Sequence, residues 1–160
     1  MVKNSKNLFI KFIFLVSIIA LVSAFFIEYI LGHQPCNLCI LERIPYLLAI
    51  IVVLLNYKFI QFEKFFILLL AIIFLAGTIL SLYHLGIEQG FIKESLVCDL
   101  KNGSNLLSKE EILKQLQEKS ISCKDVTFKI FGLSLTSYNI LISLLITIGA
   151  GKIYFNYDKN

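Results

Sequence analysis

Two pairs of cysteines are the residues of this sequence best suited to chemistry. Cys36 and Cys39 form a Cys-x-x-Cys motif directly after Pro35, whereas Cys98 and Cys123 lie 123 − 98 = 25 positions apart in a polar segment. A Cys-x-x-Cys pair can close a small disulfide ring, and its thiolates are stabilised at a helix start or beside a cation. Electrons pass between two such pairs when a thiolate attacks a neighbouring disulfide sulfur. The sequence therefore indicates thiol–disulfide exchange.

Other interpretations of these cysteines stay open at this point. A structural disulfide, or half of a zinc site, would give the same Cys-x-x-Cys spacing. Cys98 and Cys123, taken alone, would also fit a disulfide that only closes a loop. That interpretation weakens when both pairs are considered, because exchange needs a mobile pair beside a fixed one. We favour redox chemistry without a metal.

The only arginine of the chain follows the first motif at a helical spacing. Arg43 stands four residues after Cys39, so one helical turn would place both side chains on the same face. Its guanidinium could hold a Cys39 thiolate or polarise a bound carbonyl group. A charge at the membrane boundary is costly to bury, which favours a functional role. The alternative is that Arg43 extends to the lipid headgroups beside Glu42.

Apolar runs are the elements that must position these residues. Of the 160 residues, 58% are hydrophobic and only 16% are charged, and the runs lack the alternation of membrane strands. A bilayer core about 30 Å thick needs roughly 20 helical residues. The first run resembles a signal peptide but exceeds a usual signal core, so we expect it to be retained. The sequence predicts an all-α membrane protein, one domain over 1–160, with a bundle of four transmembrane helices at about 8–30, 38–57, 65–85 and 133–153.

Lysines indicate on which side of the membrane each connection lies. Positive residues mark the cytoplasmic side, and they flank the first run, the connection between the second and third runs, and the chain end: Lys3, Lys6, Lys11, Lys58, Lys64, Lys152 and Lys159. Both termini are therefore expected in the cytoplasm, with a short periplasmic loop over 32–43 and a long one over 86–131. Seven lysines in the long loop weaken this argument. All four cysteines fall in the two outer loops, however, where an oxidising compartment suits disulfide chemistry.

The long loop contains one predicted helix. Residues 108–111, Ser-Lys-Glu-Glu, match a capping box, which marks a helix start. Ile112, Leu113 and Leu116 follow at a spacing that gives the helix one apolar face. We expect a short amphipathic helix on the outer membrane surface, holding the loop over the ends of the spans.

Together these features resemble the disulfide bond formation protein B (DsbB) family. The resemblance covers nearly the whole chain: four spans, a Cys-x-x-Cys motif opening the second, Arg43 behind it, and Cys98 with Cys123 in the second outer loop. Residues 131–135, before the fourth span, also look like the family's segment. Each piece is common, but the combination is specific.

The resemblance implies an activity and a role for each site residue. A reduced DsbA-like periplasmic thiol oxidase would attack the Cys98–Cys123 disulfide at Cys98. Cys123 would then engage Cys36, which would release Cys39 as a thiolate facing a membrane quinone. Arg43 would stabilise that thiolate beside the quinone. The implied cofactor is ubiquinone or menaquinone, the implied location is the bacterial inner membrane, and no nucleic-acid partner is implied.

One residue departs from the DsbB pattern, and the order of the cysteines distinguishes this chain from a related group. Leu41 stands where many DsbB proteins have an aromatic residue, which could alter the fit of the quinone. The vitamin K epoxide reductase-like group also links thiols to quinones, but there the loop cysteines precede the Cys-x-x-Cys motif. The order here is the reverse, which favours the DsbB family.

His84 and Glu88 are weaker candidates. They lie four residues apart at the outer end of the third run. Histidine titrates near neutral pH, so His84 could assist proton transfer to a reduced quinone. The competing interpretation, which we favour, is an interfacial histidine with an ordinary hydrogen bond. Glu28, near the outer end of the first run, is interpreted as structural.

Overall fold

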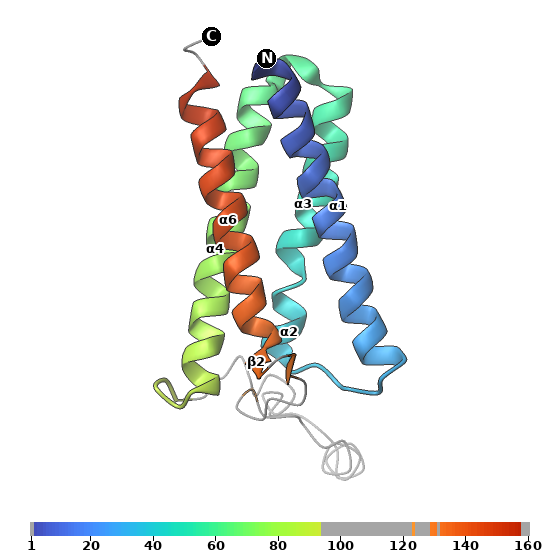
Figure 1. The fold of residues 1–160 in the computed structure, drawn as a ribbon, viewed down its shortest axis with the longest axis vertical. Helices are drawn as coiled ribbons and strands as arrows, with labels where there is room; N and C mark the ends of the chain where they lie inside the picture. The colour runs from blue at the N-terminus through green and yellow to red at the C-terminus, as the bar shows by residue number, and fades with distance from the viewer. Residues whose placement is uncertain (1, 94–122, 124–128, 131, 158–160) are drawn as a thin grey trace, which may run out of the picture.

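Four helical spans run antiparallel to one another in a bundle (Figure 1). The computed structural model describes residues 2–93, 123, 129–130 and 132–157, and the statements below concern these residues. In chain order the elements are α1 (Val2–Tyr29), α2 (Asn37–Leu41), α3 (Ile44–Lys58), the 3-10 helix η1 (Ile60–Phe62), α4 (Glu63–Glu88), β1 (Lys129–Ile130), β2 (Leu133–Ser134) and α6 (Leu135–Phe155).

All four spans are long and apolar enough to cross a bilayer, with α2 and α3 together forming the second. The outside of the bundle carries large apolar side chains that are more than half exposed, among them Leu15, Leu54, Ile79 and Leu145. A helix satisfies its own backbone hydrogen bonds, so such a surface is compatible with lipid but not with water. The predicted bundle of four transmembrane helices is confirmed.

The second span is interrupted after its first turns. α2 ends at Leu41 and α3 begins at Ile44, with Pro45 in the first turn of α3. Proline has no N–H to donate to the carbonyl four residues earlier, which here belongs to Leu41. A proline is tolerated in a first helical turn, where that donor would be unpaired in any case. The sequence suggested one continuous helix here, whereas the structure places a break at Glu42 and Arg43, the charged residues of the span.

A short hairpin leads into the fourth span. β1 and β2 pair antiparallel, with Lys129 opposite Ser134 and Ile130 opposite Leu133. Gly132 lies in the turn with a φ of 82°, a left-handed conformation that other residues rarely adopt. The sequence placed the start of this span within the hairpin, whereas α6 begins directly after β2.

The spans pack in sequence, α1 on α3, α3 on α4 and α4 on α6. α3 and α4 approach closely at Gly77, where an added Cβ would lie 3.1 Å from Cγ of Pro45. α1 and α6 meet at Gly149, where an added Cβ would lie 2.6 Å from Cζ of Phe9. Between the spans lies the main apolar core: Ile10, Ile13, Leu21, Tyr46, Ala49, Val52, Val53, Phe66, Leu70, Phe74 and Ile146.

The start of α1 and the end of α6 lie at one end of the bundle, and α2 lies at the other (Figure 1). We call these the inner and outer ends, after the topology predicted from the lysines. At the inner end, Lys6 and Glu63 form an ion pair of 3.5 Å, and the Tyr157 hydroxyl donates a hydrogen bond to Glu63. The predicted amphipathic helix after residue 107 lies outside the described residues, as does Cys98.

Candidate active site

The Cys-x-x-Cys motif opens the second span at the outer end. Cys36 is the N-cap of α2, in an extended conformation, and its Sγ accepts a hydrogen bond of 3.3 Å from the backbone N–H of Cys39. The two Sγ atoms lie 2.8 Å apart as unbonded thiols. The motif therefore stands at the start of α2, directly after Pro35, and this prediction is confirmed.

Cys36 is the more enclosed of the two thiols. It is 6% exposed, and its Sγ lies 3.5 Å from Nε2 of His84. The hydrogen bond with Cys39, followed by burial, raises the pKa of the Cys36 thiol above its ordinary value, and the hydrogen bond with His84 opposes this effect. Cys39 is partly exposed, so the two thiols of the motif differ in their surroundings.

Cys123 lies against the motif. It is 2% exposed and forms one apolar cluster with Cys36, Leu38 and Ile87. The short and the long outer segments, which are far apart in the sequence, therefore meet at their cysteines on one side of the bundle. Such proximity of cysteines from the two segments is one condition for exchange between two pairs. Cys98 belongs to the part of the long segment that the structure does not describe.

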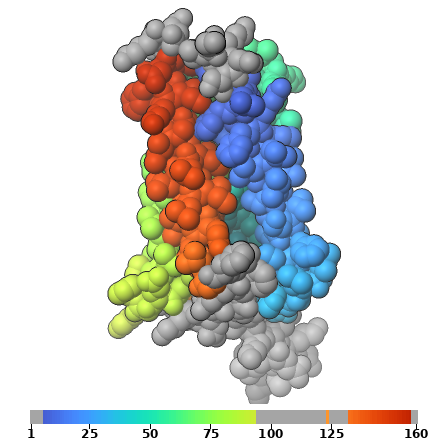
Figure 2. All heavy atoms as spheres, viewed as in Figure 1, coloured from blue at the N-terminus to red at the C-terminus, as the bar shows by residue number. Residues whose placement is uncertain are grey.

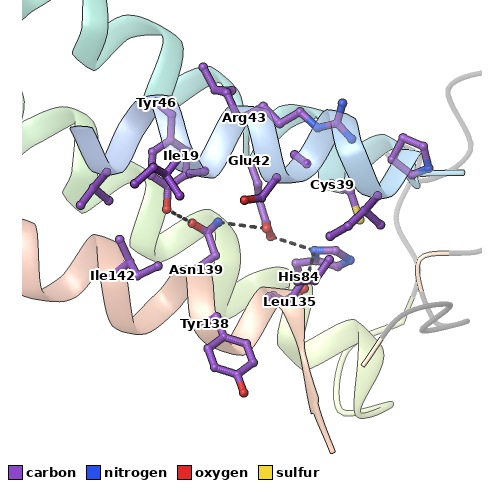
Figure 3. A pocket seen from close by; sticks show the side chains of 18 of the residues that line it. Ile19, Cys39, Glu42, Arg43, Tyr46, His84, Leu135, Tyr138, Asn139 and Ile142 are labelled. Carbon is purple, nitrogen blue, oxygen red and sulfur yellow. Dashed lines mark hydrogen bonds and ion pairs between the residues drawn. The ribbon is translucent and has the colours of Figure 1, made fainter. Parts of the chain in front are cut away.

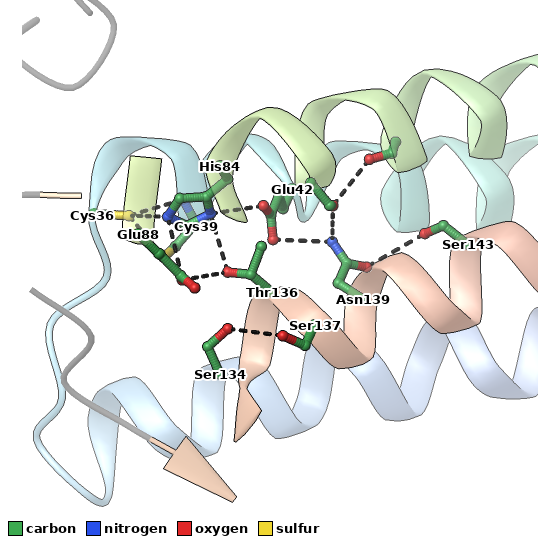
Figure 4. Close-up of polar contacts among 12 residues, drawn as sticks. Cys36, Cys39, Glu42, His84, Glu88, Ser134, Thr136, Ser137, Asn139 and Ser143 are labelled. Carbon is green, nitrogen blue, oxygen red and sulfur yellow. Dashed lines mark hydrogen bonds and ion pairs between the residues drawn. The ribbon is translucent and has the colours of Figure 1, made fainter. Parts of the chain in front are cut away.

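His84 connects the cysteines to a buried polar network (Figure 4). It is 1% exposed, and its Nδ1 lies 2.8 Å from Oε1 of Glu42 and 3.2 Å from the hydroxyl of Thr136. Thr136 donates in turn to Oε1 of Glu88 at 2.7 Å. The sequence suggested an interfacial histidine with an ordinary hydrogen bond, whereas the structure buries His84 beside the reactive pair.

Asn139 of α6 completes this network. Its Nδ2 donates to Oε2 of Glu42 at 3.0 Å and to the hydroxyl of Ser81 at 2.8 Å. Its Oδ1 accepts a hydrogen bond from the hydroxyl of Tyr46. Asn139, Thr136 and Glu42 were not predicted from the sequence as site residues. The available signal was that each is a polar residue in a membrane span, where polar side chains are costly and usually face the interior of the bundle.

Arg43 carries a specific partner. Its NH1 nitrogen lies 2.6 Å from Oε2 of Glu28 on α1, and its guanidinium lies 5.2 Å from the ring centre of Phe25. The sequence suggested that Arg43 holds a Cys39 thiolate, and Glu28 was interpreted as structural. The structure makes Glu28 the counter-ion of Arg43 and places both Arg43 and Cys39 on the wall of one cavity.

That cavity, of about 550 Å³, lies between α1 and α6. Figure 2 shows the hollow between these two helices, and Figure 3 shows lining residues of its polar wall, with Glu42 reaching toward Asn139 of α6 and Arg43 extending along α1. Lining side chains of both helices, among them Ile19 and Leu145, are also more than half exposed on the outside of the bundle. The cavity therefore opens sideways, toward lipid.

Comparison with known proteins agrees with the geometry. Residues 6–152 match the family model described as Disulfide bond formation protein DsbB. The chain belongs to the DsbB family. Its relatives include an uncharacterized protein from Rickettsia prowazekii (strain Madrid E), which is 37% identical over 150 residues that cover 91% of this chain and 85% of the relative. Membership identifies this DsbB protein as a multi-pass membrane thiol oxidase that acts in disulfide bond formation.

Proposed function

We propose that this DsbB protein reoxidises a DsbA-like thioredoxin-fold oxidase and passes the electrons through two cysteine pairs to a membrane quinone. One observation carries the proposal: Cys36, Cys39 and Cys123 all line one apolar, laterally open cavity, and Cys123 packs in one cluster with Cys36. One site would thus support both disulfide exchange with a soluble partner protein and electron transfer to a quinone in the membrane.

The thiol steps balance as two successive exchanges. A thiolate of the reduced partner attacks Cys98, Cys123 leaves as a thiolate, and the second thiol of the partner then releases the oxidised partner. The reduced loop pair attacks the Cys36–Cys39 disulfide: Cys123 bonds to Cys36, and Cys39 leaves as a thiolate. Cys98 then displaces Cys36 and restores the Cys98–Cys123 disulfide. Two electrons and two protons have moved from the partner to the Cys36–Cys39 pair.

The residues of the cavity fit a quinone. When bound, a quinone supplies an acceptor for two electrons and two protons. Apolar side chains of α1 and α6 would hold its tail, and the guanidinium of Arg43, fixed by Glu28, would donate to a ring carbonyl. His84 would take the proton of the Cys36 thiol through Nε2; the contact of Nε2 with Cys36 and the contact of Nδ1 with Glu42 support this role.

The same proposal includes the orientation in the membrane. The outer end faces the periplasm and both termini lie in the cytoplasm, with the bacterial inner membrane as the location. The lysine distribution and the meeting of Cys36 and Cys123 at the outer end support it.

The test is quinone-dependent oxidation of a reduced thioredoxin-fold dithiol by the purified chain. We expect turnover with ubiquinone or menaquinone analogues and none without a quinone. Serine at Cys36, Cys39, Cys98 or Cys123 should abolish turnover, because each exchange needs its sulfur. Gln61→Ser, an exposed change at the inner end, serves as the control. Turnover at the wild-type rate in all four serine variants, or without any quinone, would exclude the relay.

A further inference from the structure

The reduced Cys36–Cys39 pair and His84 together present a set of ligand atoms for a metal ion. The two Sγ atoms and a ring nitrogen of His84 all lie within 4.8 Å of one another (Figure 4). We propose that the reduced pair binds Zn²⁺ through Cys36, Cys39 and Nε2 of His84, and that the bound ion holds the protein in its reduced state. The sequence alone offered only two of these ligands, which is half of a zinc site.

The distance between Cys36 and His84 already matches a tetrahedral zinc site, whereas the distance between the two cysteines is shorter. Bonds of about 2.3 Å to sulfur and about 2.0 Å to nitrogen place a sulfur and a nitrogen ligand roughly 3.5 Å apart. Sγ of Cys36 and Nε2 of His84 are 3.5 Å apart. Two sulfur ligands need about 3.8 Å, whereas Cys36 and Cys39 are 2.8 Å apart. A rotation of the partly exposed Cys39 side chain would supply the difference.

The partners of His84 orient it for coordination. A zinc-binding histidine usually donates its other ring N–H to a carboxylate, which fixes the tautomer and the plane of the ring. Here Nδ1 lies 2.8 Å from Oε1 of Glu42, and Asn139 holds the second oxygen of the same carboxylate. With the proton on Nδ1, the lone pair of Nε2 points toward Cys36.

The ligand types and the surroundings favour Zn²⁺. Thiolate sulfur and imidazole nitrogen suit this ion, whereas Mg²⁺ and Ca²⁺ take oxygen ligands. Three protein ligands leave a fourth position for water, and the cavity that both cysteines line gives an entry path. Glu88, whose Oε1 lies 3.8 Å from Nε2, adds negative charge beside the site.

Binding would depend on the redox state of the pair. As Zn²⁺ binds, two S–H bonds break, two protons leave and two Zn–S bonds form. The oxidation states of sulfur and zinc do not change, so no electron acceptor is needed. A Cys36–Cys39 disulfide has no thiolate to offer and would not bind. With the ion bound, neither sulfur can attack a disulfide or pass on its electrons, and the cycle stops until the metal is removed.

Cobalt provides a direct measurement, because Co²⁺ bound by thiolates absorbs visible light and Zn²⁺ displaces it. The full chain with Cys98→Ser and Cys123→Ser, which leaves only the first pair, is titrated with Co²⁺ in the reduced and in the oxidised state. We expect a tetrahedral thiolate spectrum with one ion per chain in the reduced protein, its loss on addition of Zn²⁺, and no such spectrum in the oxidised protein. Equal spectra in both states would overturn the proposal.

Two histidine variants separate the proposed ligand from a nonspecific effect. His84→Gln should weaken Co²⁺ binding strongly, whereas His33→Gln, at the other histidine of the chain, should leave it unchanged. Glu42→Gln should weaken binding by about 10- to 100-fold, the usual effect of losing the partner of a ligand histidine. Binding that is unchanged in both His84→Gln and Glu42→Gln would reject the site. The titration contains neither quinone nor partner protein, so its result is independent of the proposed electron relay.

Discussion

The carboxylate of Glu42 shows how single residues hold the site together. Its Oε1 lies 2.8 Å from Nδ1 of His84, and its Oε2 accepts a hydrogen bond from Asn139. A buried carboxylate without such partners would be very costly. Asn139 also contacts Ser81 of α4 and Tyr46 of α3, so one amide side chain joins α3, α4 and α6 just inside the reactive pair.

Removal of this amide should therefore destabilise the bundle. Asn139→Leu removes the donor to Oε2 of Glu42 and the donor to the Ser81 hydroxyl, and we expect a loss of about 1–3 kcal/mol in the free energy of unfolding for each buried atom left unsatisfied. Thermal unfolding in detergent measures it. Asn56→Leu is the control, because Oδ1 of the buried Asn56 has no hydrogen-bond partner among the described residues. We expect that change to be neutral or stabilising. Equal losses in both variants would contradict the role of the network.

Arg43 can be tested separately from the cysteines. Arg43→Ala should raise KM for the quinone by about tenfold or more, since a hydrogen bond to a charged group contributes about 1.5–3 kcal/mol. The exchange of disulfides with the partner, measured in a single turnover without quinone, should keep its rate. Lys58→Ala, at the inner end, is the control for loss of a positive charge. A slower exchange with unchanged KM would mean that Arg43 acts on the cysteines instead.

Residue types explain which parts of the site the sequence predicts. Cysteines in two outer segments and a lone arginine carry distinctive chemistry, so they could be selected without a structure. Asn139 and Thr136 could not, because a polar residue in an apolar run does not reveal which helix it faces. The contact between Arg43 and Glu28 was likewise missed, since it joins helices through a packing angle that spacing along one chain does not give.

At the scale of elements, the contact between α3 and α4 positions both halves of the network. Glu42 lies in the break directly before α3 and His84 lies on α4, and Gly77 of α4 allows the close approach to Pro45 of α3. A side chain at Gly77 would push the rigid proline ring away and separate the two helices.

We therefore expect Gly77→Leu to lower the free energy of unfolding by about 1–3 kcal/mol, the usual cost of overpacking. Gly151→Leu is the matched control, because an added Cβ at Gly151 meets no atom within 4 Å. Thermal unfolding of both variants in detergent provides the comparison. A Gly77 variant as stable as the Gly151 variant would show that the two helices can separate at no cost.

The elements also show what periodicity can and cannot predict. Long apolar runs predict four spans, because a lipid bilayer accommodates such continuous apolar surface and water does not. The break at Glu42 and Arg43 and the β1–β2 hairpin depend on single residues, Pro45 and Gly132. The apolar pattern alone does not show that Pro45 and Gly132 interrupt the helix at these points, because apolar residues continue on either side of them.

At the scale of the whole molecule, the proposed orientation makes a prediction about accessibility. In a cysteine-free variant, Gln89→Cys at the outer end should react with a membrane-impermeant maleimide in intact spheroplasts. Gln61→Cys at the inner end should react only in inverted vesicles. Both positions are exposed, so each serves as the control for the other. The reverse pattern would place the reactive cysteines in the cytoplasm.

α1 and α6 meet at Phe9 and Gly149 near the inner end, and from Phe9 outward both helices line the cavity. A quinone bound as proposed, with its ring beside Cys39, would therefore extend its isoprenoid chain into the lipid. The protein would not contact the far end of that chain, so it would not discriminate between chains of different length. The protein would select acceptors by the shape of the head and accept many chain lengths. Saturation of the protein by the quinone would then depend on the ratio of quinone to lipid in the membrane, not on the concentration of quinone in water.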